Sequence, residues 1–97
     1  MIKLNLKSTV KEHFDRVSKI PAQVLDETTK YFVKQTPVRT GNARRRTYRT
    51  GNTITANYPY AGKLDDGYSR QAPEGMTEPS EEYLVNKMDE YIRKNKE

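Results

Sequence analysis

An apolar stripe at helical spacing runs along the first third of the chain and is broken once, by a proline. The steps between its members alternate between four and three residues, which is the spacing of one helix face. The members are Val10, Phe14, Val17, Pro21, Val24, Thr28 and Tyr31. The stripe predicts a helix over residues 8–35. Because proline lacks an N–H and crowds the preceding turn, we expect this helix to kink or divide at Pro21 and to end before Pro37.

The length of this helix limits the shape of the domain. Unbroken, it would be about 40 Å long at 1.5 Å per residue. A compact globule of this chain length has a diameter of only about 32 Å. The helix therefore either bends at Pro21 or projects beyond the domain, and a projecting stripe would need a neighbouring subunit.

The middle of the chain predicts a hairpin followed by a short helical turn. Arg44–Arg49 and Thr53–Tyr58 form the two expected strands, and Thr50-Gly51-Asn52 suits the link between them. The segment Tyr60–Asp66 is expected to form a helical turn closed by Gly67. Residues 68–79, with their prolines and glycine, predict a loop.

A last helix is expected from Ser80, which can cap it, to about Lys94. Leu84, Met88, Tyr91 and Ile92 give this helix one apolar face. The order of elements predicts a single α+β domain over residues 1–97. In this fold a long N-terminal helix and a C-terminal helix pack on a small antiparallel sheet.

The core of this domain is expected to be thin. Leu, Ile, Val and Phe number 17 of 97 residues, and the net charge is +5. The periodic runs favour a folded chain, but one that gains stability from assembly. The chain has no Cys, which excludes disulfides and thiolate metal sites and fits a reducing compartment. No run approaches the roughly 20 apolar residues of a membrane span or resembles a signal peptide, so we expect synthesis in the cytoplasm and no membrane partner.

The sequence offers little for catalysis. His13 is the only histidine, and without cysteine or a second histidine it is a poor metal ligand. Asp65 and Asp66 are adjacent, so their side chains diverge, whereas an acid–base pair must converge. The pair suits a turn before Gly67. We expect no enzyme activity, no metal and no cofactor.

A basic run is the most distinctive local feature. No acidic residue lies between Glu27 and Asp65, and that stretch carries eight Lys or Arg residues. In a strand, Arg44, Arg46 and Tyr48 would share one face, with Arg45 and Arg49 on the other. Two interpretations stay open: the arginines contact an acidic neighbour or DNA phosphates, or they form a solvated edge strand that their charges protect from unwanted pairing.

Tyrosines are also abundant, with seven in the chain and no Trp. Tyr58, Tyr60 and Tyr68 cluster in the segment 57–76. Tyrosine is enriched at interfaces because one end is apolar and the other polar. The alternative is that these rings cover the sheet and complete the core.

Two motifs resemble those of one protein family. Residues 36–45, TPVRTGNARR, look like the turn of tailed-bacteriophage neck and tail-completion proteins. Residues 57–76, NYPYAGKLDDGYSRQAPEGM, resemble the same family's signature N-x-x-P-Y-A-x-x-L-E-x-G-x-S-x-Q-A-P-x-G-M, with Asp65 in place of the glutamate and one residue fewer between Asn57 and Pro59. The resemblance covers nearly the whole chain and implies an α+β connector fold.

The resemblance also implies a function and a set of partners. It implies a structural virion protein, a ring at the head–tail junction that joins the portal or adaptor to the tail and lets DNA pass. Which ring of the neck it forms stays open. The residues that we expect at a subunit or partner interface are Arg39, Arg44, Arg45, Arg46, Arg49, Tyr60, Tyr68, Gln71, Pro73 and Met76.

Two other function classes compete with this one. The basic run and the net charge also suit a small nucleic-acid-binding module or regulator, although only Tyr48 and Tyr58 could serve as a stacking platform for single strands. A toxin-like nuclease would need a converging His, Glu and Arg cluster, which the sequence does not indicate.

Overall fold

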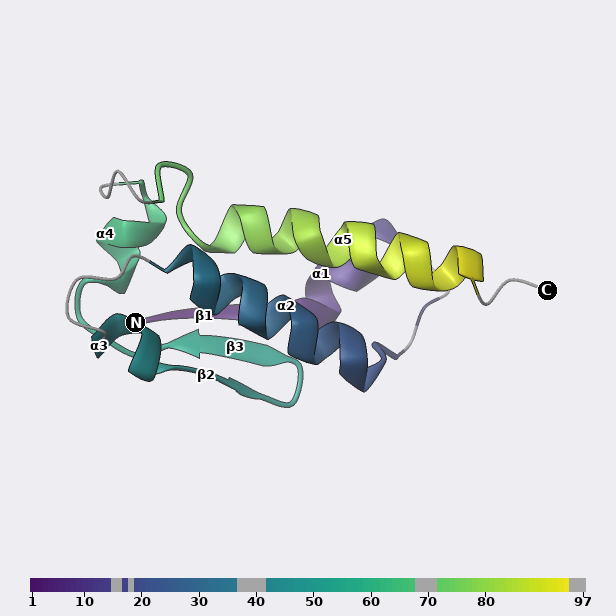
Figure 1. The fold of residues 1–97 in the computed structure, drawn as a ribbon, viewed down its shortest axis with the longest axis horizontal. Helices are drawn as coiled ribbons and strands as arrows, with labels where there is room; N and C mark the ends of the chain where they lie inside the picture. The colour runs from purple at the N-terminus through teal and green to yellow at the C-terminus, as the bar shows by residue number, and fades with distance from the viewer. Residues whose placement is uncertain (15–16, 18, 37–41, 68–71, 95–97) are drawn as a thin grey trace.

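The computed structural model describes residues 1–14, 17, 19–36, 42–67 and 72–94. It is an α+β domain in which helices pack on one side of an antiparallel sheet, as expected (Figure 1). The elements, in chain order, are β1 (Ile2–Asn5), α1 (Leu6–His13), α2 (Ala22–Gln35), α3 (Asn42–Arg45), β2 (Thr47–Thr50), β3 (Thr53–Ala56), α4 (Ala61–Asp65) and α5 (Thr77–Lys94).

The sheet has three strands in the order β1-β3-β2. The hairpin of β2 and β3 is confirmed, with Thr50 opposite Thr53 and Gly51 at a φ of +60° in the turn. The first strand, β1, was not predicted. It pairs with β3 through a register that places Leu4 opposite Ile54. The alternation of Ile2, Leu4 and Leu6 with polar residues is the strand period that indicates it.

The prediction of one helix over residues 8–35 that divides at Pro21 is partly confirmed: two helices form, but the first ends well before the proline, and the described residues between His13 and Ala22 are not helical. Helix α1 ends at His13 and α2 begins directly after the proline, at Ala22. The first helix begins at Leu6, because the Asn5 side chain accepts a hydrogen bond from the backbone N–H of Ser8 at 3.1 Å and caps it. Helix α2 ends at Gln35, and Pro37, which was expected to stop it, lies outside the described residues.

The prediction of a strand from Arg44 to Arg49 is partly wrong. Residues 42–45 form the short helix α3, and the strand β2 begins only at Thr47. Ala43 is buried in the core, and its carbonyl accepts a hydrogen bond from the Thr47 hydroxyl at 2.8 Å. Ala and Arg are good helix formers, so local propensity and core packing agree here.

The last helix also begins earlier than predicted. Helix α5 starts at Thr77, and Ser80 is fully buried within it rather than capping it. The Ser80 N–H already bonds the Met76 carbonyl at 3.2 Å, four residues back. Pro79 is accommodated because it lies in the first turn, where its missing N–H has no intrahelical partner to lose. The short helix α4 and the turn closed by Gly67 are as expected.

The core lies between the sheet and the helices. Leu6, Phe32, Ile54 and Leu84 are fully buried, and they come from α1, α2, β3 and α5. The domain is elongated, with extents of 47 × 23 × 19 Å and a radius of gyration of 13.7 Å. A compact chain of this length would have a radius of about 12.5 Å. The short helix α4 lies at one end of the long axis, and the C-terminal half of α5 lies at the other (Figure 1).

Candidate interaction surfaces

The side chains of two of the five candidate arginines, Arg44 and Arg49, bind other groups of the same domain. Arg44 donates from Nε to the Thr36 carbonyl at 3.1 Å and from Nη2 to the Lys34 carbonyl at 3.2 Å. It thereby binds two of the open carbonyls at the C-terminus of α2, where a positive charge also suits the helix dipole. Arg49 forms an ion pair with Asp26 of α2 at 2.7 Å and donates to the Gly51 carbonyl. Arg44 thus holds α3 against the end of α2, and Arg49 holds the hairpin against α2.

The side chains of Arg45 and Arg46 remain available. Both residues are exposed, and neither side chain has a hydrogen-bond or ion-pair partner within the part of the chain that the structure describes. The expectation that Arg44 shares a strand face with Arg46 is wrong, because α3 turns Arg44 toward the end of α2. Arg39 lies outside the described residues.

Asp65 has a structural role that the sequence did not indicate. Its Oδ1 accepts hydrogen bonds from the backbone N–H groups of Met76 at 3.0 Å and Thr77 at 2.8 Å. These are N–H groups at the beginning of α5, which cannot bond within the helix. A carboxylate at this position also suits the helix dipole. Asp65 therefore caps α5 from another segment, while Asp66 is exposed to solvent.

Two glycines of the same segment allow the backbone to close around this cap. Gly67 and Gly75 have φ values of +88° and +78°. A Cβ at Gly75 would overlap the Asp65 carbonyl, and a Cβ at Gly67 would overlap the Pro73 carbonyl. Residues 64–67 and 72–76 therefore form a close backbone contact, called the clamp below, that joins α4 to α5.

The candidate residues around this clamp divide into buried and exposed ones. Met76 is fully buried, so the expectation that its side chain is exposed toward a neighbour is wrong; its thioether fills the core beneath the clamp. Pro73 is exposed. Tyr68 and Gln71 lie outside the described residues.

The tyrosines here also differ. Tyr58 is 2% exposed, and its hydroxyl has no hydrogen-bond partner among the described atoms. Burial, with smaller effects from Tyr60 and Asp65, raises the pKa of Tyr58 to about 12. A buried Tyr58 cannot stack on a nucleic-acid base, which weakens the single-strand platform. Tyr60, by contrast, is 41% exposed, and its ring packs at a tilt against Tyr58 with centroids 4.8 Å apart.

A half-open groove of about 340 Å³ lies at the opposite end of the domain. The start of α2 and the last turns of α5 form it. Tyr91 was expected on the apolar face of α5, but it is 42% exposed and contributes to the wall of the groove. Lys94 donates to Glu90 at 3.2 Å and lowers the pKa of that carboxyl, with Lys87 adding to the effect. The lining residues are Pro21, Gln23, Val24, Glu27, Lys87, Glu90, Tyr91 and Lys94.

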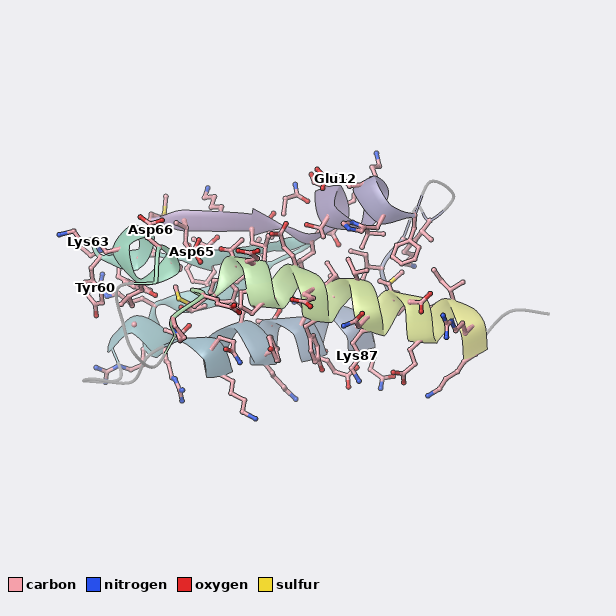
Figure 2. All side chains as sticks on the ribbon, turned by 90° about the horizontal axis from the view of Figure 1, so that it is seen from above. Glu12, Tyr60, Lys63, Asp65, Asp66 and Lys87 are labelled. Carbon is pink, nitrogen blue, oxygen red and sulfur yellow. The ribbon has the colours of Figure 1, made fainter. Side chains whose placement is uncertain are left out.

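Figure 2 shows how the two ends differ. Tyr60, Lys63 and Asp66 project around α4 at one end, whereas Lys87 lies toward the other end on α5. Lys63 is three residues after Tyr60, so both lie around the same short helix and both are exposed. Among the described residues, Glu27 of the groove has no ion-pair partner.

The described residues hold no group of three or more His, Cys, Asp or Glu side chains that could bind a metal ion. His13 lies exposed on α1, as expected, with Nδ1 3.2 Å from the Thr9 carbonyl oxygen. Among the helices of the described ranges, none is long and apolar enough to cross a membrane.

No family model, curated protein or solved structure matches this chain. The resemblance to neck and tail-completion proteins therefore stays a prediction, and the functional argument depends on the surfaces described above.

Proposed function

We propose that this chain is a structural subunit of the neck of a tailed bacteriophage. In this proposal copies of the chain form a ring at the head–tail junction of the virion, contact portal or adaptor and tail proteins, and let DNA pass. Two kinds of observation support it. The motifs of residues 36–45 and 57–76 resemble those of neck proteins. The domain is also elongated and presents complementary features at its two ends.

The complementary ends carry the proposal. One end exposes the Tyr60 ring beside the Lys63 ammonium, and the other has the groove with Tyr91 and the Glu27 carboxylate. An exposed aromatic side chain at one end suits a partly apolar groove of another copy. Lys63 would at the same time approach Glu27, which gives the contact electrostatic complementarity.

Such a contact joins two different surfaces of the same chain. Contacts of this type are heterologous, and repeating one of them closes into a ring when the rotation between subunits permits it. A chain with a thin core gains stability when each copy covers a neighbour's exposed aromatic side chains. End-to-end contact would thus assemble a ring whose subunits lie along its circumference.

The Tyr60→Ala variant tests this contact. We expect it to shift the chain from rings to monomers, because truncating an aromatic residue at the centre of an interface costs about 2 kcal/mol or more of binding free energy per contact. Light scattering coupled to size-exclusion chromatography measures the mass of the assembly. Circular dichroism verifies that the variant is folded.

Tyr48→Ala is the matched control. Tyr48 is 47% exposed, similar to Tyr60, but lies on the sheet rather than at the end of the domain. We expect Tyr48→Ala to retain the mass of the wild-type ring. Equal masses for wild type and Tyr60→Ala would contradict the end-to-end contact.

A further inference from the structure

We propose that the uncovered face of the sheet binds the sugar–phosphate backbone of double-stranded DNA without reading its sequence. This face, called the outer sheet face below, is the side of the sheet opposite the helices. The inference rests on the proposed function, in which DNA crosses the ring. It adds the surface of this chain that contacts the DNA.

The strand register defines the outer sheet face. Successive side chains of a strand point to opposite sides. Leu4 and Ile54 are paired and buried against the helices, so their neighbours Lys3 and Thr55 point to the opposite side, where Lys3 is exposed and Thr55 of the central strand is only 4% exposed. Tyr48 lies opposite Thr55 on the other edge. The same alternation gives the following set: Lys3, Asn5, Tyr48, Thr50, Thr53 and Thr55.

Arg46 extends this set by one step. Its carbonyl accepts a hydrogen bond from the N–H of Asn57 at 2.9 Å, which continues the ladder of β2 and β3 beyond Thr47. Thr47 is buried on the helix side, so Arg46 alternates to the side of Tyr48. Arg46 and Lys3 are both exposed: Lys3 lies in the edge strand β1, and Arg46 directly precedes β2, the other edge strand.

The charge of this face is of one sign. Lys3 and Arg46 contribute two cations, and neither the strands nor the segment from Lys30 to Leu64 contains a carboxylate. Two strand spacings separate the edge strands by about 10 Å. This is comparable with the roughly 12 Å width of the DNA major groove, whose two sides carry the phosphates.

The composition of the outer sheet face favours DNA over a protein partner. Its residues are Lys, Arg, Tyr, Thr and Asn, which are the side chains that contact phosphate and sugar in protein–DNA complexes. A protein interface would be expected to have an apolar centre, and Tyr48 is the one large partly apolar side chain of the set. The face also lies along the side of the domain, so an end-to-end ring leaves it uncovered (Figure 1).

The double variant Lys3→Glu/Arg46→Glu tests the proposal. Fluorescence anisotropy with a short labelled DNA duplex measures affinity between roughly 50 and 200 mM salt. We expect the wild-type chain to bind with a salt dependence typical of phosphate contacts. We expect the double variant to bind at least tenfold more weakly, with the slope of log K against log salt reduced by about 2, since each phosphate contact contributes about 0.9.

Lys30→Glu/Lys34→Glu is the matched control. Both lysines are exposed on α2, away from the outer sheet face, and the change in net charge is identical. We expect this control to bind DNA nearly as tightly as the wild type. Equal losses in both double variants would overturn the proposal, because the effect would then come from net charge alone. The proposal would also be overturned if the wild-type chain did not bind the duplex at low salt. The same holds if the Lys3→Glu/Arg46→Glu variant lost binding to an acidic protein instead of binding to DNA.

Measuring the mass of the assembly in the same samples separates this inference from the proposed function. If rings form normally but do not bind DNA through Lys3 and Arg46, only the proposal that the outer sheet face binds DNA is overturned. If monomers bind DNA through these residues, the result supports DNA binding by the outer sheet face but contradicts the proposed ring.

Discussion

Gly75→Ala is expected to destabilise the chain by about 3 kcal/mol. The substitution places a Cβ against the backbone carbonyl of Asp65, and neither backbone segment can move without opening the clamp. The φ of +78° adds strain, because L residues, unlike the achiral glycine, adopt this region at a cost of about 1–2 kcal/mol. Urea unfolding followed by circular dichroism measures the loss.

Gly62→Ala provides the control for this substitution. Gly62 lies in α4, and a Cβ there would meet no described atom within 4 Å. Alanine is the better helix former, so we expect the control to be neutral or to stabilise the fold by about 0.5–1 kcal/mol. An unfolding midpoint for Gly75→Ala close to that of the wild type would show that the clamp is not closed in this way.

Asp65→Ala is expected to cost about 2 kcal/mol. The substitution removes the acceptor of two N–H groups at the start of α5, together with a negative charge that the helix dipole favours. Hydrogen bonds to charged groups contribute about 1.5–3 kcal/mol, and partial solvent access at this site keeps the expected value toward the lower end. The same urea experiment measures the loss.

Asp66→Ala is the matched control, since it removes an identical carboxylate one residue further along. Asp66 is exposed and accepts no hydrogen bond through its side chain among the described residues. We expect a change within about 0.5 kcal/mol. Similar losses for both variants would mean that net charge, and not capping, determines the stability.

Local patterns predicted much of the fold. The start of α2 after Pro21, the hairpin around Gly51, the helical turn before Gly67 and most of the apolar face of α5 each depend on residues within a few positions of one another. The misassigned elements depend in part on distant residues, although the alternation of Ile2, Leu4 and Leu6 and the helix propensity of residues 43–45 are local signals. The strand β1 needs β3 as a partner, about fifty positions along the chain, and α5 begins at Thr77 because Asp65 caps it.

The candidate surfaces were less predictable for the same reason. A run of arginines indicates positive charge, but it does not indicate which of the arginines form hydrogen bonds or ion pairs within the domain. Arg44 and Arg49 bind α2, and this depends on how the hairpin packs. Lys3 was not among the candidate residues, because only the pairing of β1 with β3 brings it to the face of Tyr48.

Electron microscopy of the purified chain, alone and mixed with portal or tail components, tests the central claim most directly. The account predicts closed rings in which each elongated subunit contacts its neighbour end to end, and attachment of these rings to the phage components. A stable solitary monomer under both conditions would contradict it.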